Sequence, residues 1–221
     1  MGSAKLDRTL AGLAGLAMLI VVALIVGIVL TGVGQDFFQS ARPTEEFVAK
    51  VTTNPAHALG LRINLGLDNL FIVIYATYFV VLAERFNAGM NSRIMTVALS
   101  AILLTAFLDA IENAHIMMML HSIQHALPVS VTESQWQMVL SQVKFHSSYV
   151  ALFLFALCFW KEGVWGRAIA AVFWLYVLLG LTAMVMPIEL ARPLALGRTL
   201  FFITSFLLSA LFFWRAQLHR N

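Results

Sequence analysis

The sequence predicts an all-α integral membrane protein, a bundle of six transmembrane helices with both termini in the cytoplasm. Hydrophobic residues make up 61% of the chain and charged residues 11%, whereas soluble domains contain about 45–50% apolar residues. Six apolar stretches are long enough to cross ~30 Å of hydrocarbon at about 1.5 Å per residue. The loops between them leave no room for a soluble domain, so we expect residues 1–221 to form one membrane domain.

The six predicted spans follow one another along the whole chain. They cover about residues 9–33, 62–83, 93–121, 140–160, 167–187 and 197–215. Lys5 and Arg8 precede the first span, as in a signal peptide, but the apolar stretch exceeds the usual length of about 7–15 residues and no small-residue cleavage site follows. We therefore interpret this segment as an uncleaved first helix.

Two of the connections carry helix signals of their own. Residues 43–52 combine a proline, a threonine and two glutamates with the apolar Val48 and Val51, which predicts a short amphipathic helix on the outer face. Ahead of the fourth span, Thr132 followed by Glu133 is typical of a helix start. The fourth helix is therefore expected to begin before the chain enters the membrane.

Charge and cysteine content exclude several classes of function. The formal net charge of +3 is small and spread among the loops, so nucleic acid is not an expected partner. Basic residues in the short loops "ERFNAGMNSR" and "WKEGVWGR" place these loops, and with them both termini, on the cytoplasmic side. Cys158 is the only cysteine, which excludes disulfides, CxxC redox chemistry and cysteine-based zinc sites.

The main functional signal is a group of ionisable residues inside the spans. In the predicted topology Asp68, Asp109, Glu112 and Lys144 lie roughly 8, 16, 12 and 6 Å below the outer boundary. A charged group near the centre of a membrane costs about 2.5 kcal/mol or more and is usually paired or functional. Because three separate helices supply these groups at similar depth, we predict that they meet in the outer half of the membrane, and that Lys144 neutralises at least one of the two acids on the third helix.

Helical periodicity sorts the polar side chains onto faces. At about 100° per residue, Lys144 shares a face with Gln137, Ser141 and Ser148, whereas His146 points to the other side of the helix. The residues assigned to the site are Asp68, Asp109 and Glu112 as acid–base or catalytic groups, and Arg62, Asn64, Asn69, Tyr75, Asn113, Lys144 and Arg198 as ligand-binding groups.

These residues predict a polar, charged pocket that opens to the periplasm. Arg62, Lys144 and Arg198 would hold the head group of a small amphipathic or anionic ligand such as a lipid, and the acids would act as counter-ions or as acid–base groups if the ligand is modified. Membrane lipids are the expected partners. An alternative of another class is a structural or assembly subunit in which the same charges form only a salt-bridge network.

Two metal sites and a proton-coupled function are further alternatives. Glu112 and His115 have the i, i+3 spacing of carboxylate–histidine metal sites, and with His146 they could bind a divalent transition metal in a membrane enzyme. The segment "HIMMMLHSIQH" offers thioethers and imidazoles to Cu(I), from His115, Met118, Met119, His121 and His125. Buried acids near a lysine also suit proton-coupled transport, although the inner halves of these helices are apolar.

The stretches "LDNLFIVIY", "LDAIENAH" and "VKFHSSY" form a series over the second to fourth spans. This series resembles a pattern in small, uncharacterised bacterial polytopic membrane proteins that have an Asp near the start of one span, D-x-x-E-N in the next and a Lys in the following one. The resemblance covers about a third of the chain. It implies a multi-pass protein of the bacterial inner membrane and supplies no activity.

Overall fold

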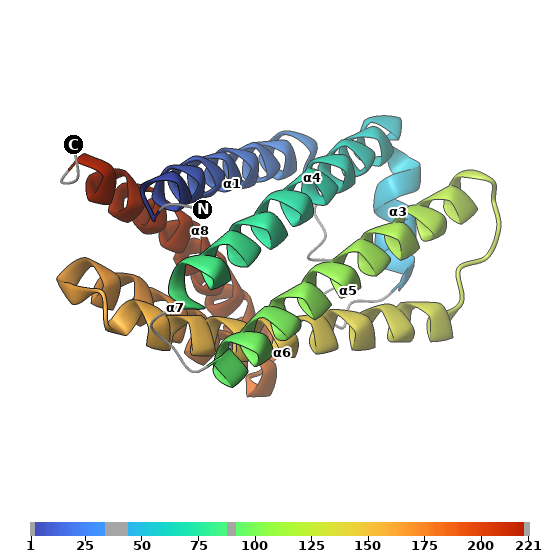
Figure 1. Cartoon of the computed structure of the whole chain (residues 1–221). Coiled ribbons are helices and arrows are strands. Elements are labelled where there is room, and N and C mark those ends of the chain that lie inside the picture. Colours follow the sequence, from blue (N-terminus) through green and yellow to red (C-terminus); the bar gives the residue numbers. More distant parts are fainter. Residues whose placement is uncertain (1–2, 34–43, 88–91, 219–221) are drawn as a thin grey trace. The chain divides into compact units, whose positions relative to one another are not determined.

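The computed structural model describes residues 3–33, 44–87 and 92–218, and within these ranges it shows helices joined by short connections (Figure 1). Six of the helices have the length and apolar composition to cross a membrane. They are α1 (Ser3–Thr31), α4 (Pro55–Phe86), α5 (Ser92–Gln124), α6 (Val131–Trp160), α7 (Gly163–Val185) and α8 (Ile188–Leu218). The predicted all-α class and the six predicted spans are confirmed.

The fourth spanning helix begins with Ser130 as its N-cap, two residues before the helix start predicted at Thr132. The Ser130 hydroxyl accepts a hydrogen bond from the backbone N–H of Glu133 at 3.1 Å, and α6 starts at the next residue, Val131. Ser130 and Glu133 have the S-x-x-E spacing of a capping box. The predicted start at Thr132 is therefore wrong, because Thr132 lies within the first turn, whereas the prediction that the helix begins before the apolar stretch is confirmed.

The last helix also begins earlier than predicted. The sequence interpretation started this span at about residue 197 and treated the residues before it as a connection, but α8 starts at Ile188 and contains Pro193. Pro193 is the sixth residue of α8, beyond the first four N–H groups that have no partner within a helix, so its missing N–H removes one backbone hydrogen bond near this end without ending the helix. The connection between α7 and α8 is consequently reduced to Met186 and Pro187.

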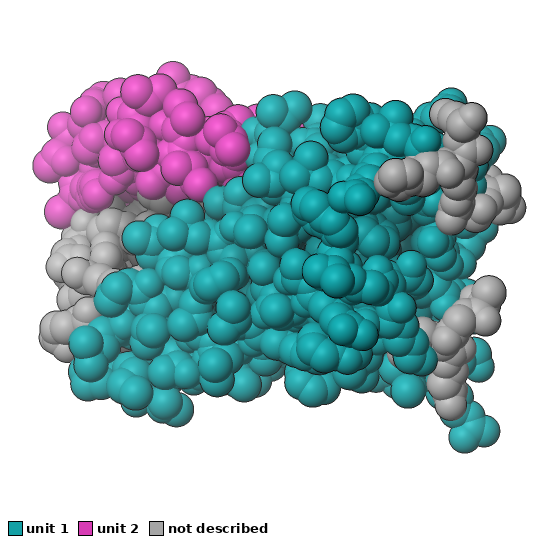
Figure 2. Space-filling model, turned by 90° about the vertical axis from the view of Figure 1, so that its left-hand side faces the viewer, with its two compact units in different colours: residues 1–19, 74–104, 145–221 teal, residues 20–73, 105–144 magenta. Residues whose placement is uncertain are grey.

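The helices divide into two compact units (Figure 2). Unit 1 comprises residues 1–19, 74–104 and 145–221, and unit 2 comprises residues 20–73 and 105–144. The helices α1, α4, α5 and α6 contribute residues to both units. The helices α7 and α8 belong to unit 1, and the short helix α3 (Thr44–Thr53) belongs to unit 2.

Unit 1 is held together by packed aromatic rings. Phe159 is fully buried, and its ring centroid lies 5.1 Å from that of Phe86, 5.9 Å from that of Phe173 and 6.1 Å from that of Phe213. These rings come from α4, α6, α7 and α8. Aromatic contacts of this kind contribute about 0.5–1.5 kcal/mol each beyond the burial of their area, so a single phenylalanine joins four helices of the unit.

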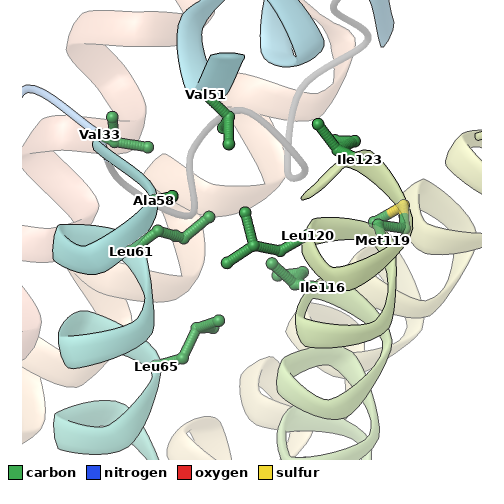
Figure 3. Close-up of a cluster of buried hydrophobic side chains, with 9 residues drawn as sticks. All are labelled: Val33, Val51, Ala58, Leu61, Leu65, Ile116, Met119, Leu120 and Ile123. Carbon is green, nitrogen blue, oxygen red and sulfur yellow. The ribbon is translucent and has the colours of Figure 1, made fainter. Parts of the chain in front are cut away.

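Unit 2 has an apolar core in which the short helix takes part (Figure 3). Val51 of α3 is buried against Leu61 of α4 and Leu120 of α5, and Val48 packs at the edge of the same cluster. The predicted short helix is therefore present over Thr44–Thr53, its position on the outer face stays a prediction, and Pro43, with which the prediction began, lies outside the described residues. Its apolar face packs on the ends of two spanning helices.

Candidate functional site

The end of α5 determines how α6 returns beside it. Ala126 has a left-handed backbone with φ of 56°, the N–H of Ala126 donates to the carbonyl of Ile123 at 3.1 Å, and the N–H of Leu127 donates to that of Ser122 at 2.8 Å. These are the two hydrogen bonds of a Schellman motif, which usually has glycine at the left-handed position. The motif ends α5 sharply, so a short loop leads into α6.

Three residue pairs show that α5 and α6 run antiparallel through unit 2. Asp109 contacts Lys144, Glu112 contacts Ser141, and His115 contacts Gln137. As the residue number rises on α5 it falls on α6, and the steps of three or four residues keep all six side chains on facing sides of the two helices. We call these residues, together with Glu133, the polar ladder; its members are Asp109, Glu112, His115, Glu133, Gln137, Ser141 and Lys144.

One end of the ladder is an ion-pair triad. The Lys144 ammonium lies 2.8 Å from Asp109 Oδ1 and 2.5 Å from Glu112 Oε2. Glu112 is completely buried, and its other carboxylate oxygen accepts a hydrogen bond from the Ser141 hydroxyl at 3.0 Å. The predicted neutralisation of these acids by Lys144 is confirmed, and the one ammonium serves both of them.

The next part of the ladder is built around His115. Its Nδ1 lies 2.5 Å from the side-chain oxygen of Gln137, and its Nε2 lies 3.4 Å from a carboxylate oxygen of Glu133. Because an amide oxygen only accepts hydrogen bonds, Gln137 favours the imidazole tautomer that carries its proton on Nδ1. Nε2 then faces Glu133 with a free lone pair, so it is the nitrogen that can take up a second proton.

Helix α4 contributes a neighbouring amide and carboxylate group. The Asn113 amide donates to Asp68 Oδ2 at 2.7 Å and to Asn69 Oδ1 at 3.0 Å. Asp68 is thus tied to α5 through Asn113. Asn64, one turn earlier on α4, donates to the backbone carbonyl of Val33 at 3.2 Å, so its amide joins α4 to the end of α1.

Each of the three cations predicted to hold an anionic head group has partners within its own unit. Lys144 is paired with two acids, and Arg62 is exposed and donates to the side chain of Gln124. Arg198 belongs to unit 1, where its guanidinium lies 3.7 Å from the centre of the Phe145 ring and donates to the Tyr149 hydroxyl at 3.1 Å. Tyr75 is buried in unit 1 as well.

The hypothesis of a metal site made of Glu112, His115 and His146 gains no support. His146 is exposed in unit 1, whereas Glu112 and His115 use their polar atoms within the ladder. Among residues 3–33, 44–87 and 92–218, no group of three or more His, Cys, Asp and Glu side chains is placed to hold a metal ion.

One buried ion pair was missed by the sequence interpretation. Asp7 of α1 is completely buried and accepts a hydrogen bond from Arg85 of α4 at 2.8 Å, and the same guanidinium lies 3.9 Å from Glu162. Positions 7, 85 and 162 all fall at span ends that the predicted topology assigns to one side of the membrane. Two acids and one cation at the same predicted side of the membrane are the signal from which this ion pair could have been predicted.

Comparison with protein-family models, with characterised proteins and with solved structures finds no match to this chain.

Proposed function

We propose that the chain is a multi-pass protein of a bacterial inner membrane and that its polar ladder carries protons between the membrane surface and the buried triad. The observation that carries this proposal is the sequence of titratable groups along α5 and α6, from Glu133 through His115 to Glu112, Lys144 and Asp109. Chains of Asp, Glu and His inside membranes commonly serve as proton relays.

The solvent exposure of the titratable groups falls from Glu133 to His115 to Glu112, as a relay from the medium to a buried site requires. The Glu133 side chain is 31% exposed, that of His115 is 20% exposed and that of Glu112 is fully buried. Glu133 exchanges protons with the medium, His115 Nε2 takes up the proton from Glu133, and the next acceptor along α5 is Glu112, one helical turn away. At a rise of about 1.5 Å per residue the backbones of His115 and Glu112 are roughly 5 Å apart along the axis of α5, so the imidazolium would pass its proton to Glu112 through a water molecule.

The triad gives the relay an end point. When Glu112 accepts a proton, its attraction to the Lys144 ammonium is lost, and Lys144 is left with Asp109 as its partner. Protonation of one carboxylate thus changes which acid holds the lysine. Such a change couples proton uptake to the packing of α5 against α6, which is what a proton-driven transport or enzymatic step requires.

Infrared difference spectroscopy of the protein in lipid vesicles tests the relay directly. When the pH falls from about 8 to about 5, the range in which histidine titrates, the wild type should gain the C=O band of a protonated buried carboxyl group, and Glu112→Gln should lack this band. After a rapid pH jump, His115→Phe should gain the same band more slowly. Gln135→Ala, which changes an exposed residue of α6 outside the ladder, is the matched control.

The outcomes separate the relay from a salt-bridge network that serves only architecture. A band whose rate of appearance is the same in His115→Phe and in the wild type would show that His115 carries no proton. No carboxyl band in the wild type over this range would show that the triad keeps its charges, and the network would then be purely structural.

A second candidate function, binding of a small anionic amphiphile, is favoured by the contacts of Arg198. This half-buried arginine lies in a membrane-spanning helix, and its contacts within the described chain are a tyrosine hydroxyl and a phenylalanine ring. Neither partner carries a negative charge. A guanidinium has five N–H donors in a planar fork that fits phosphate, so the head group of an anionic lipid supplies the missing charge.

Native mass spectrometry tests this second candidate with two short-chain lipids. Dihexanoyl phosphatidic acid should bind to the wild type more strongly than dihexanoyl phosphatidylcholine, and Arg198→Gln should abolish the difference. Arg167→Gln is the matched control, because Arg167 also lies near an aromatic ring, that of Trp160, but is exposed. If Arg198→Gln and Arg167→Gln weakened phosphatidic acid binding equally, the lipid would be held by unspecific charge attraction. This result would contradict a site at Arg198.

A further inference from the structure

Two exposed histidines lie against each other where α5 ends. The ring centroids of His121 and His125 are 4.2 Å apart, with 66° between the ring planes. Both side chains are exposed, and within the described part of the chain neither ring has a hydrogen-bond or ion-pair partner. Outside the ladder, His57 differs, because its Nδ1 lies 2.8 Å from the carbonyl oxygen of Lys50.

The spacing of this pair is that of a helical metal chelate. Two histidines at positions i and i+4 on one helix face can bind the same metal ion, and the N–H of His125 still donates to the carbonyl of His121 at 3.2 Å, which keeps this turn helical. The ring nitrogens are engaged by no other group of the described chain, so binding a metal breaks no existing interaction.

The three consecutive methionines before the pair are used in different ways. Met119 is buried in the apolar core of unit 2 (Figure 3), and Met117 packs against the edge of that core. Met118 is 64% exposed. At about 100° per residue, Met118, His121 and His125 fall within an arc of roughly 60° on one face of α5, so an exposed thioether lies on the same side as the two imidazoles.

We propose that His121 and His125, with the thioether of Met118, form a binding site for Cu(I) at this end of α5. Two neutral imidazole nitrogens and one thioether sulfur are soft ligands that suit Cu(I), whereas hard cations prefer oxygen. The site is separate from the polar ladder, in which His115 is engaged by Gln137 and Glu133, and it does not depend on the proton relay.

Competition for Cu(I) against a chromophoric chelator tests the site. The protein is purified without a polyhistidine tag and titrated anaerobically with a reductant present, and the wild type should bind one equivalent. Replacing a residue that only supports a metal ligand typically lowers metal affinity by about 10- to 100-fold. Replacing two direct ligands should have a larger effect, so the double variant His121→Ala with His125→Ala should lower the Cu(I) affinity by at least about 100-fold. Met118→Leu should lower it by at least about 10-fold on the same scale.

Met117→Leu is the matched control, because it makes the same chemical change one residue away on a side chain that packs into the core. X-ray absorption at the copper edge should show sulfur in the wild type and in Met117→Leu but not in Met118→Leu. Because both histidines are exposed, the double histidine variant should fold as the wild type does. Thermal unfolding of both proteins without metal checks this.

Two results would overturn the site. Unchanged Cu(I) affinity in the double histidine variant would show that the imidazoles are not ligands. If Met118→Leu kept the Cu(I) affinity and the sulfur signal, the Met118 thioether would not be a ligand, and the argument for a preference for Cu(I) would fail.

Discussion

Lys144 Nζ lies 2.5 Å from Glu112 Oε2, and the Glu112 side chain is fully buried. This ion pair is therefore formed away from solvent, where a single charge without its partner is costly. Because the same ammonium also contacts Asp109 at 2.8 Å, loss of the lysine leaves two acids facing each other, whereas loss of one acid leaves the lysine paired.

Lys144→Met should therefore destabilise the protein more than Glu112→Gln does. Removing one partner of a buried pair costs about 3–5 kcal/mol, whereas removing both can be nearly neutral. The double variant Lys144→Met with Glu112→Gln should recover part of the stability lost in Lys144→Met. Thermal unfolding in detergent measures the difference, with Lys161→Met at an exposed position as the control. A double variant as unstable as the sum of its single changes would show that the two charges are not coupled.

Ala126→Gly should stabilise the turn between α5 and α6. A left-handed backbone costs an L-residue roughly 1–2 kcal/mol, and glycine avoids this strain at the φ of 56° that Ala126 adopts. After subtraction of the greater entropy that glycine has in the unfolded chain, about 0.5–1 kcal/mol, we expect a gain of up to about 1 kcal/mol. Unfolding in detergent measures it. Ala110→Gly, in the middle of α5, should have the opposite sign.

Gly180→Ala should disturb the contacts of Tyr149. A Cβ at Gly180 would overlap the Tyr149 ring and hydroxyl, the group to which Arg198 donates. Overpacking of this kind costs about 1–3 kcal/mol. In contrast, Gly12→Ala, where a Cβ meets nothing within 4 Å, should stabilise α1 by up to about 1 kcal/mol because alanine favours helix. The two unfolding midpoints should move in opposite directions.

The predicted orientation in the membrane calls for accessibility measurements in intact cells. In a Cys158→Ala background, a cysteine in place of Pro128, in the loop between α5 and α6, should react with a membrane-impermeant thiol reagent. A cysteine in place of Val164, at the start of α7, should react only after the cells are opened. Both positions are exposed. The reverse pattern of labelling would invert the topology and place both termini outside.

The contacts that could be predicted from the sequence are those within one helical hairpin. The pairing of Lys144 with Asp109 and Glu112 follows from their depth along two consecutive antiparallel helices, because a short loop leaves little freedom in how the two helices align. The same reasoning placed Gln137 and Ser141 on the face of Lys144 and His146 on the other side, as the structure has them.

Contacts between helices distant in sequence could not be predicted in this way. Arg198 was assigned to the outer entrance of the pocket because it lies in the predicted connection before the last span. Its partners Phe145 and Tyr149 lie on α6, and the packing of α8 against α6 is decided by the shapes of many apolar side chains. The pair of Asp7 and Arg85 was missed for a related reason. Residues at the ends of spans were counted only for their effect on orientation, although a charge there can still be buried by a neighbouring helix.

The shared ammonium of the triad also bears on how this chain enters its membrane during synthesis. On the insertion scale, Asp or Lys at the centre of a helix costs about 2.5–3.5 kcal/mol, so α5 and α6 are each penalised when they leave the translocon alone. The short turn closed by Ala126 lets the two helices meet before either faces lipid, and each then brings the counter-charge that the other lacks. We expect α5 and α6 to be released into the bilayer as a pair, which makes the ion pairs a condition for inserting the chain as well as for stabilising it afterwards.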